Sequence, residues 1–303
     1  MGTKGKHITR KRKSFEETDP YLFTLPPETI VEPLVERISH PIWTENKAKL
    51  IERYLFYFIQ ITKHGCYVDG FAGPQQPDKP ETWAAKLVLE IEPTWLTQFH
   101  LFESDNSKID ILNDLRARHA DRKVEIYLGD FNQNVSTLLD SGAIGQKEAA
   151  FCLIDQRTFE CHWSTLLALA KYKSSNYKIE LFYFFANSWF DRAFAAQKDK
   201  DVLNRWWGKE DWECLRPMKS ADRINLMMER FKKELGYKSV KPWPIYERKD
   251  GGRIMYYMIH ATDHLVAPSL MSRAYKKALG AKEPAEQFLL EFYRPSEGKQ
   301  GGK

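Results

Sequence analysis

The chain has 303 residues, of which 43% are hydrophobic and 14% aromatic, so it can bury a sizeable core and is not globally disordered. No uninterrupted apolar run approaches about 18 residues and no apolar segment follows the basic N-terminus, so we expect neither a membrane span nor a signal peptide. The net charge is +5, and six of the 46 basic residues lie within the first 13, where no acid occurs. The basic character therefore belongs to an N-terminal arm, and the rest of the chain is close to neutral.

This basic arm is the first feature along the chain. It could contact nucleic-acid phosphates by releasing counterions, or it could be a solvated tail. The residues after it are proline-containing and weakly periodic, so we assign 1–40 to an arm and lead-in. The basic residues of the arm are Lys4, Lys6, Arg10, Lys11, Arg12 and Lys13.

A helix is predicted next, because apolar side chains after Trp43 recur at i, i+3, i+4 and i+7 and Thr44 is placed to cap. The residues at this spacing are Lys47, Leu50, Ile51, Tyr54, Leu55, Phe58 and Ile59.

Short apolar runs then alternate with segments compatible with helices, which indicates parallel βαβ units and a sheet covered on both faces. The strands are predicted at 66–71, 99–105, 124–130, 149–155 and 179–185, and the helices at 83–91, 106–118, 132–140 and 163–172.

The alternation stops after residue 190. A charged, tryptophan-rich stretch at about 196–238 predicts a helical insert, and 243–262 predicts an antiparallel hairpin that turns at Asp250-Gly251-Gly252. A helix is predicted over about 267–279, and the last residues, 286–303, are predicted to be a tail. The fold class expected for 41–285 is thus α/β: a Rossmann-like class I methyltransferase fold with a mostly parallel seven-stranded sheet.

The first strand ends in a turn that suits a small-molecule site. Glycines let the backbone approach a ligand, and a carboxylate binds hydroxyl or ammonium groups. Here Asp69 is followed by Gly70 and Gly73, but the spacing is not G-x-G-x-x-G. Pro74 and Pro77 also disfavour the immediate helix start that cradles a pyrophosphate, so a dinucleotide site is not expected.

Three more predicted strands end in acids. Glu103 could bind ribose hydroxyls or only begin the next helix, although Asp105 suits that capping role better. Asp130 and Phe131 could bond and stack on an adenine. Asp155 ends the fourth strand and is the predicted catalytic position, where it would position an acceptor or take a proton, the alternative being a helix cap.

Gln156 and Arg157 follow Asp155 and could add hydrogen bonds or a phosphate contact. Asn187 and Ser188 follow the fifth strand and could form a pocket wall. Both pairs occupy loops next to strand ends, where substrate-contacting residues of α/β sheets are usually found.

No metal site is predicted. The four cysteines lack zinc-ligand spacing, Cys161-His162 has no second ligand pair, and free thiols favour a cytoplasmic protein. His260, Asp263 and His264 are close in sequence but are expected to be structural.

The insert contains indoles interleaved with basic residues. Such indoles could stack nucleic-acid bases, although packing within the insert is the favoured reading. The residues concerned are Trp206, Trp207, Trp212, Arg205, Lys209 and Arg216.

Four segments together resemble the three-Cys-motif partner proteins, a bacterial and phage-associated group described as methyltransferase-like. These segments are "WTENKAKLIERYLFYF", "YVDGFAGPQ", "LIDQRTFECHWSTL" and "LFYFFANSWFDRA", within roughly 40–280. The resemblance implies a separate partner with a three-cysteine, radical-enzyme-like motif.

The first-strand motif is also similar to the D-x-F-A-G motif of DNA methyltransferases that bind S-adenosylmethionine. That similarity implies S-adenosylmethionine as the cofactor, with Glu103 at its ribose and Asp130 and Phe131 at its adenine. The methionine part would be surrounded by Asp69, Gly70, Phe71, Ala72 and Gly73.

The chain departs from that resemblance where the chemistry is expected. The amino-methyltransferase motif D-P-P-Y is replaced here by 155–158, "DQRT", and no Pro-Cys nucleophile is present. Two hypotheses follow: a methyltransferase acting on a nucleic acid or nucleotide-like acceptor, and a non-catalytic adaptor that retains the fold. A nuclease is a third possibility, which no paired-carboxylate motif supports.

Overall fold

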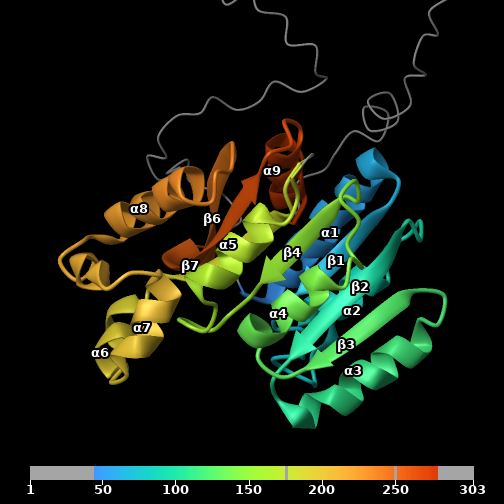
Figure 1. The fold of residues 1–303 in the computed structure, drawn as a ribbon, viewed down its shortest axis with the longest axis horizontal. Helices are drawn as coiled ribbons and strands as arrows, with labels where there is room; N and C mark the ends of the chain where they lie inside the picture. The colour runs from blue at the N-terminus through green and yellow to red at the C-terminus, as the bar shows by residue number, and fades with distance from the viewer. Residues whose placement is uncertain (1–43, 175–176, 249–250, 279–303) are drawn as a thin grey trace, which may run out of the picture.

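A computed structural model of the chain describes residues 44–174, 177–248 and 251–278. Its strands form one sheet in the order β3-β2-β1-β4-β5-β7-β6 (Figure 1). The strands β1 to β5 are parallel, and β7 runs antiparallel to both β5 and β6. The bounds are β1 Gly65–Asp69, β2 Leu96–Glu103, β3 Lys123–Leu128, β4 Ala150–Ile154, β5 Glu180–Ala186, β6 Ser239–Arg248 and β7 Gly251–Thr262.

This arrangement confirms the predicted fold class, a Rossmann-like class I methyltransferase sheet with a C-terminal antiparallel pair. The helices of the parallel part also lie where periodicity placed them, within a few residues. They are α1 Thr44–Thr62, α2 Ala84–Leu89, α3 Asn106–Arg118, α4 Phe131–Asp140 and α5 Trp163–Lys171, and α9 Ala267–Ala278 follows the hairpin. The basic arm and the C-terminal tail lie outside the described residues, as does Asp250 of the predicted hairpin turn, whereas Gly251 and Gly252 of that turn begin β7.

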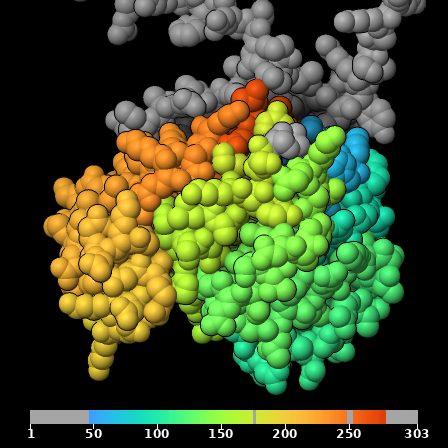
Figure 2. Space-filling model, in the orientation of Figure 1, coloured from blue at the N-terminus to red at the C-terminus, as the bar shows by residue number. Residues whose placement is uncertain are grey.

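The helical insert forms a lobe beside the sheet, drawn in yellow and orange (Figure 2). It begins at Phe190, a few residues earlier than predicted, because the residues after β5 turn directly into a short helix. Its elements are α6 Phe190–Ala196, α7 Lys200–Trp207, the 3-10 helix Asp211–Leu215 and α8 Ser220–Lys233.

The tryptophans of this insert are core residues. Trp206, Trp207 and Trp212 are at most 4% exposed, and the guanidinium of Arg230 lies between the rings of Trp163 and Trp207, at 3.8 and 3.9 Å. The indole N–H groups of Trp207 and Trp212 are bonded inside the lobe, and that of Trp206 donates to the Tyr183 hydroxyl of β5. The predicted packing role is therefore confirmed, and base stacking on these indoles is not available.

Helix α1 runs along one face of the sheet, from the carboxyl ends of the strands to their amino ends. Lys47, Ile51, Tyr54 and Phe58 follow one another at i, i+4, i+7 and i+11, so they share one face of the helix. The ring of Tyr54 lies 5.4 Å from that of Phe151 in the middle of β4. Phe58 lies at the amino end of β1, and Lys47 therefore comes to the carboxyl edge, where the predicted site residues are.

Helices pack on both faces of the sheet. Helix α1 contacts α2 and α9, whereas α4 contacts α5, which contacts α7. Figure 1 shows α4 and α5 in front of the sheet and α1 behind it. Among the described residues, no helix is both long and apolar enough to cross a bilayer.

Candidate functional site

The strand register brings the four predicted acids to one edge of the sheet. Asp69 pairs with Leu153, so Asp155 lies two residues further on, directly after the end of β4. Glu103 ends β2, and Asp130 follows β3 at the same edge. The strand order reverses between β1 and β4, and in open α/β sheets this is where ligands bind.

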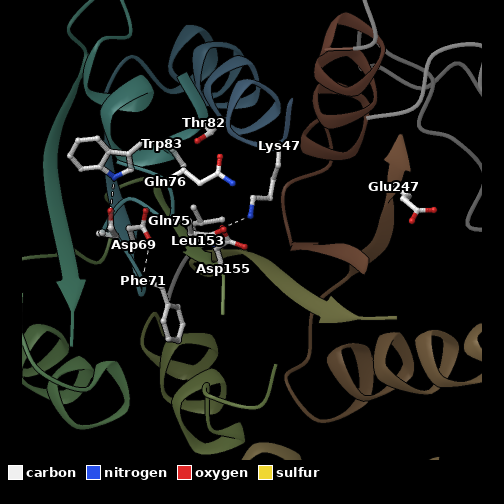
Figure 3. A pocket seen from close by; sticks show the side chains of 13 residues that line it. Lys47, Asp69, Phe71, Gln75, Gln76, Thr82, Trp83, Leu153, Asp155 and Glu247 are labelled. Atoms are coloured by element: carbon white, nitrogen blue, oxygen red, sulfur yellow. Dashed lines mark hydrogen bonds and ion pairs between the residues drawn. The ribbon is translucent and has the colours of Figure 1, made fainter. Parts of the chain in front are cut away.

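A cavity of about 350 Å³ opens at that reversal (Figure 3). Its walls come from the end of β1, the turn that follows, the end of β4, the first turn of α1, the loop before α2 with the start of that helix, and the end of β6. They are Lys47, Asp69, Phe71, Ala72, Gly73, Gln75, Gln76, Thr82, Trp83, Ala84, Leu153, Asp155 and Glu247.

Asp69 is the most deeply placed acid of the cavity wall, at 2% exposure. Its carboxylate accepts hydrogen bonds from the Tyr67 hydroxyl at 2.8 Å and from the Phe71 backbone N–H at 3.1 Å. Burial outweighs both bonds and raises the pKa of Asp69 from 3.8 to about 7, with Asp155 and Glu103 adding smaller contributions. The carboxylate is thus poised to gain from a cationic ligand group.

Asp155 is paired with a lysine that the sequence analysis did not identify as functional. The Lys47 ammonium donates to Oδ2 of Asp155 at 2.5 Å, and Figure 3 shows the two side chains pointing toward each other. Oδ1 of Asp155 is buried and has no hydrogen-bond partner among the described residues. The signal for Lys47 was present: a lysine at the head of a buried helical stripe needs a partner.

Lys47 stays charged in this position. Burial alone would lower the pKa of the ammonium, but the neighbouring Asp155 carboxylate and the Tyr256 side chain outweigh that effect, and the pKa is raised. The Lys47 side chain is 7% exposed, so little water competes for its N–H groups.

Glu103 closes the turn after β1. Its Oε2 accepts from the Gly73 N–H at 3.0 Å and its Oε1 from the Asp105 N–H at 2.8 Å. Each carboxylate oxygen keeps a second lone pair, but Glu103 is buried and does not line the cavity, so its ribose contact stays a prediction. Asp105 caps α3 through the Ser107 N–H, which confirms the capping role expected for it.

Gly73 is required by this close approach. A Cβ at position 73 would overlap Oε2 of Glu103 and lie 2.6 Å from Cδ of Lys108. We expect Gly73→Ala to lower the free energy of unfolding by about 1–3 kcal/mol, as overpacking does. Gly145→Ala is the control, because its Cβ would meet nothing closer than 3.7 Å. Urea unfolding of both variants checks this, and equal losses would contradict it.

The predicted adenine side of the site is filled by protein in this structure. Phe131 is 2% exposed, and its ring packs against Phe71 and Phe102. A Cβ on Gly70 would lie 2.8 Å from the same ring. The predicted stacking of adenine on Phe131 does not hold in this structure, because the ring is a core side chain without an open face. Asp130 caps α4 by accepting from the Gln133 N–H, and it does not line the cavity.

Two predicted neighbours of Asp155 do not reach the cavity. Gln156 is 2% exposed, donates to the Phe184 carbonyl at 3.2 Å and accepts from the Cys161 N–H at 2.7 Å. It therefore holds the loop after β4 rather than a substrate. The Arg157 side chain is exposed; the pKa of Asp105 is lowered mainly by its hydrogen bonds from Ser107, and Arg157 makes a smaller contribution.

Asn187 and Ser188 join the insert to the hairpin. The Asn187 side chain donates to the Ile254 carbonyl at 2.7 Å and accepts from the Ser220 hydroxyl. The backbone N–H groups of Asn187 and Ser188 both donate to the Met255 carbonyl. The predicted pocket wall is therefore a structural joint.

The histidines near the hairpin end are engaged in separate contacts. His260 bonds Glu180 at 3.0 Å, and Glu180 also accepts from the Tyr54 hydroxyl. Asp263 pairs with Lys178, and His264 accepts from the Val266 N–H. Among the residues that the structure describes, no group of three potential ligands could hold a metal ion.

The fold and the position of the cavity define the class: an α/β protein with the class I methyltransferase strand order. Solved structures that match the chain distantly include TYW2 of M. jannaschii in complex with AdoMet, at 12% identity and a TM-score of 0.36, covering 71% of this chain and 75% of that one. Another is an O-methyltransferase from Bacillus cereus in complex with SAH, at 13% identity and a TM-score of 0.38, covering 71% and 80%. No protein-family model and no curated protein matches the chain.

Proposed function

We propose that the protein binds S-adenosylmethionine at the carboxyl edge of β1 and β4 and is a methyltransferase. The observation that carries this proposal is the cavity of about 350 Å³ at the strand-order reversal, with Asp69 and Asp155 in one wall. Its volume is within the range of about 300–1,000 Å³ that small-molecule sites occupy. When bound, this cofactor supplies an electrophilic methyl group.

In this proposal, Asp69 and Asp155 have separate roles. Asp69 receives the cationic ammonium of the methionine part, while Phe71, Ala72 and Gly73 line its path. Asp155 positions the acceptor at the end of β4. Holding the acceptor and the methyl group in line supplies much of the rate, since orientation alone is worth about 7–11 kcal/mol.

The acceptor in this proposal is a nucleic acid or a nucleotide-like molecule, and the protein acts with a three-Cys-motif partner. Support comes from the resemblance of four sequence segments and from the basic arm at residues 4–13. The insert would contribute through exposed cations such as Arg205, Lys209 and Arg216, since its indoles are buried.

Calorimetric titration with S-adenosylmethionine tests the cofactor. We expect binding by the native protein and a loss of about 10- to 100-fold in Asp69→Ala, because a charge-assisted hydrogen bond is worth about 1.5–3 kcal/mol. Asp114→Ala, which removes an exposed acid of α3, is the control and should bind normally. No binding at millimolar cofactor would contradict the proposal.

The arm has its own test. Deleting residues 1–13 removes six cations, so affinity for nucleic acid should fall and the slope of log K against log salt should flatten. An unchanged affinity and slope would show that the arm is a solvated tail.

One observation favours the second candidate, a non-catalytic adaptor. Phe131 occupies the space above Gly70, and the Asp130 carboxylate is used as a helix cap. An adaptor would bind nucleic acid or the partner but no cofactor. If Phe131→Ala bound S-adenosylmethionine and the native chain did not, the filled adenine side would be the reason.

A further inference from the structure

We propose that the atom this site methylates is a hydroxyl oxygen, held between Lys47 and Asp155. For a nucleic-acid acceptor this hydroxyl is the ribose 2′-OH, so the substrate is RNA. The inference rests on the proposed methyltransferase function and adds the chemical class of the acceptor.

The pair offers two complementary groups at the cavity wall. The Lys47 ammonium has three N–H donors, and its bond to Oδ2 of Asp155 uses one of them. Oδ1 of Asp155 is buried without a partner among the described residues, an arrangement that costs free energy until something donates to it. Both side chains line the same cavity, next to Leu153 and Gln75.

A hydroxyl matches these two groups better than an amine does. Its O–H can donate to Oδ1 of Asp155 while one oxygen lone pair accepts from Lys47, and the second lone pair remains for attack. An amino nitrogen has a single lone pair, which the reaction itself needs. That nitrogen therefore cannot accept from Lys47 and attack at the same time.

Charge development points the same way. A nitrogen that gains a methyl group becomes cationic, and the buried Lys47 ammonium beside it opposes that charge. An oxygen that loses its proton becomes anionic, and the same ammonium stabilises it. The "DQRT" segment at 155–158 also lacks the proline and aromatic of the amine-methylating motif.

The transfer balances with these groups. The acceptor O–H bond breaks and its proton passes to Oδ1 of Asp155, while the new oxygen–carbon bond forms. The electron pair of the broken sulfur–carbon bond stays with sulfur. Lys47 remains protonated throughout and acts by donating hydrogen bonds.

The first test measures binding and needs no turnover. Mixed-sequence RNA and DNA hexamers are titrated by fluorescence anisotropy with S-adenosylhomocysteine present. We expect the native protein to prefer RNA at least 10-fold, and Lys47→Met to lose that preference. Lys49→Met, an exposed lysine of the same helix, is the matched control and should keep it.

If Lys47→Met fails to fold, the same titrations of RNA and DNA hexamers with Lys47→Arg and with the native protein decide whether the inference holds. Equal binding of both hexamers by the native protein, or binding of neither, overturns the inference. Retention of the RNA preference in a folded Lys47→Met protein overturns it as well.

The second test locates the methyl group. RNA labelled with the methyl-tritiated cofactor is digested with alkali, which cannot cleave next to a 2′-O-methyl ribose. Label in alkali-stable dinucleotides is expected, whereas label on bases overturns the inference and leaves the methyltransferase function standing. Failure to bind S-adenosylmethionine in the calorimetric titration would instead remove the proposed function itself.

Discussion

Asp69→Asn should remove much of the protein's loss of stability between pH 5 and pH 8. The pKa of this buried carboxyl is raised from 3.8 to about 7, so the folded protein holds the proton where the unfolded chain has released it. The stabilisation is complete below the unfolded pKa and disappears as the pH rises through about 7. From pH 5 to pH 8 the contribution is roughly 2–3 kcal/mol.

Thermal unfolding of both proteins across this pH range checks the prediction. The difference between the two curves isolates Asp69 from the histidines and other acids that titrate in parallel. Burial has the largest effect on the pKa of Asp69 and raises it. The hydrogen bonds from Tyr67 and the Phe71 N–H lower this pKa, and the nearby carboxylates of Asp155 and Glu103 raise it further. Parallel curves would show that the Asp69 carboxyl has an ordinary pKa.

Trp206→Ala should lower the free energy of unfolding by about 3–5 kcal/mol, the usual loss for a large aromatic removed from a core. Trp206 is 1% exposed, its ring lies 4.8 Å from that of Phe159, and its indole N–H donates to the Tyr183 hydroxyl at 2.8 Å. The substitution therefore opens a cavity and removes one hydrogen-bond donor from the buried Tyr183 hydroxyl.

Chemical denaturation measures this loss, with Trp95→Ala as the control. Trp95 is only partly buried at the edge of the core, and the Lys63 ammonium lies 4.4 Å from the centre of its ring. A loss for Trp206→Ala no larger than that for Trp95→Ala would contradict the packing described for the insert.

The sheet could be predicted because each of its parallel strands has a local signal in the sequence. Each buried parallel strand is a short apolar run, and each is followed by a segment with helical periodicity. The acids at the strand ends were predictable for the same reason: a residue just past a buried run must lie at the edge. Asp69 and Asp155 line the cavity for this reason.

The individual contacts could not be predicted in this way. Whether Phe131 meets a ligand or a core depends on Phe71 and Phe102, which are distant in sequence. The role of Lys47 depends on a partner 108 residues away. Periodicity placed Lys47 on the buried face correctly, but only the packing of α1 across the sheet shows what that face meets.

The position of Lys47 within α1 has a consequence for control of the site. Only two residues separate Lys47 from Thr44, where the helix begins, and everything before Thr44 leads back to the basic arm. A molecule that binds the residues directly before Thr44 therefore lies within one helical turn of the Lys47–Asp155 pair.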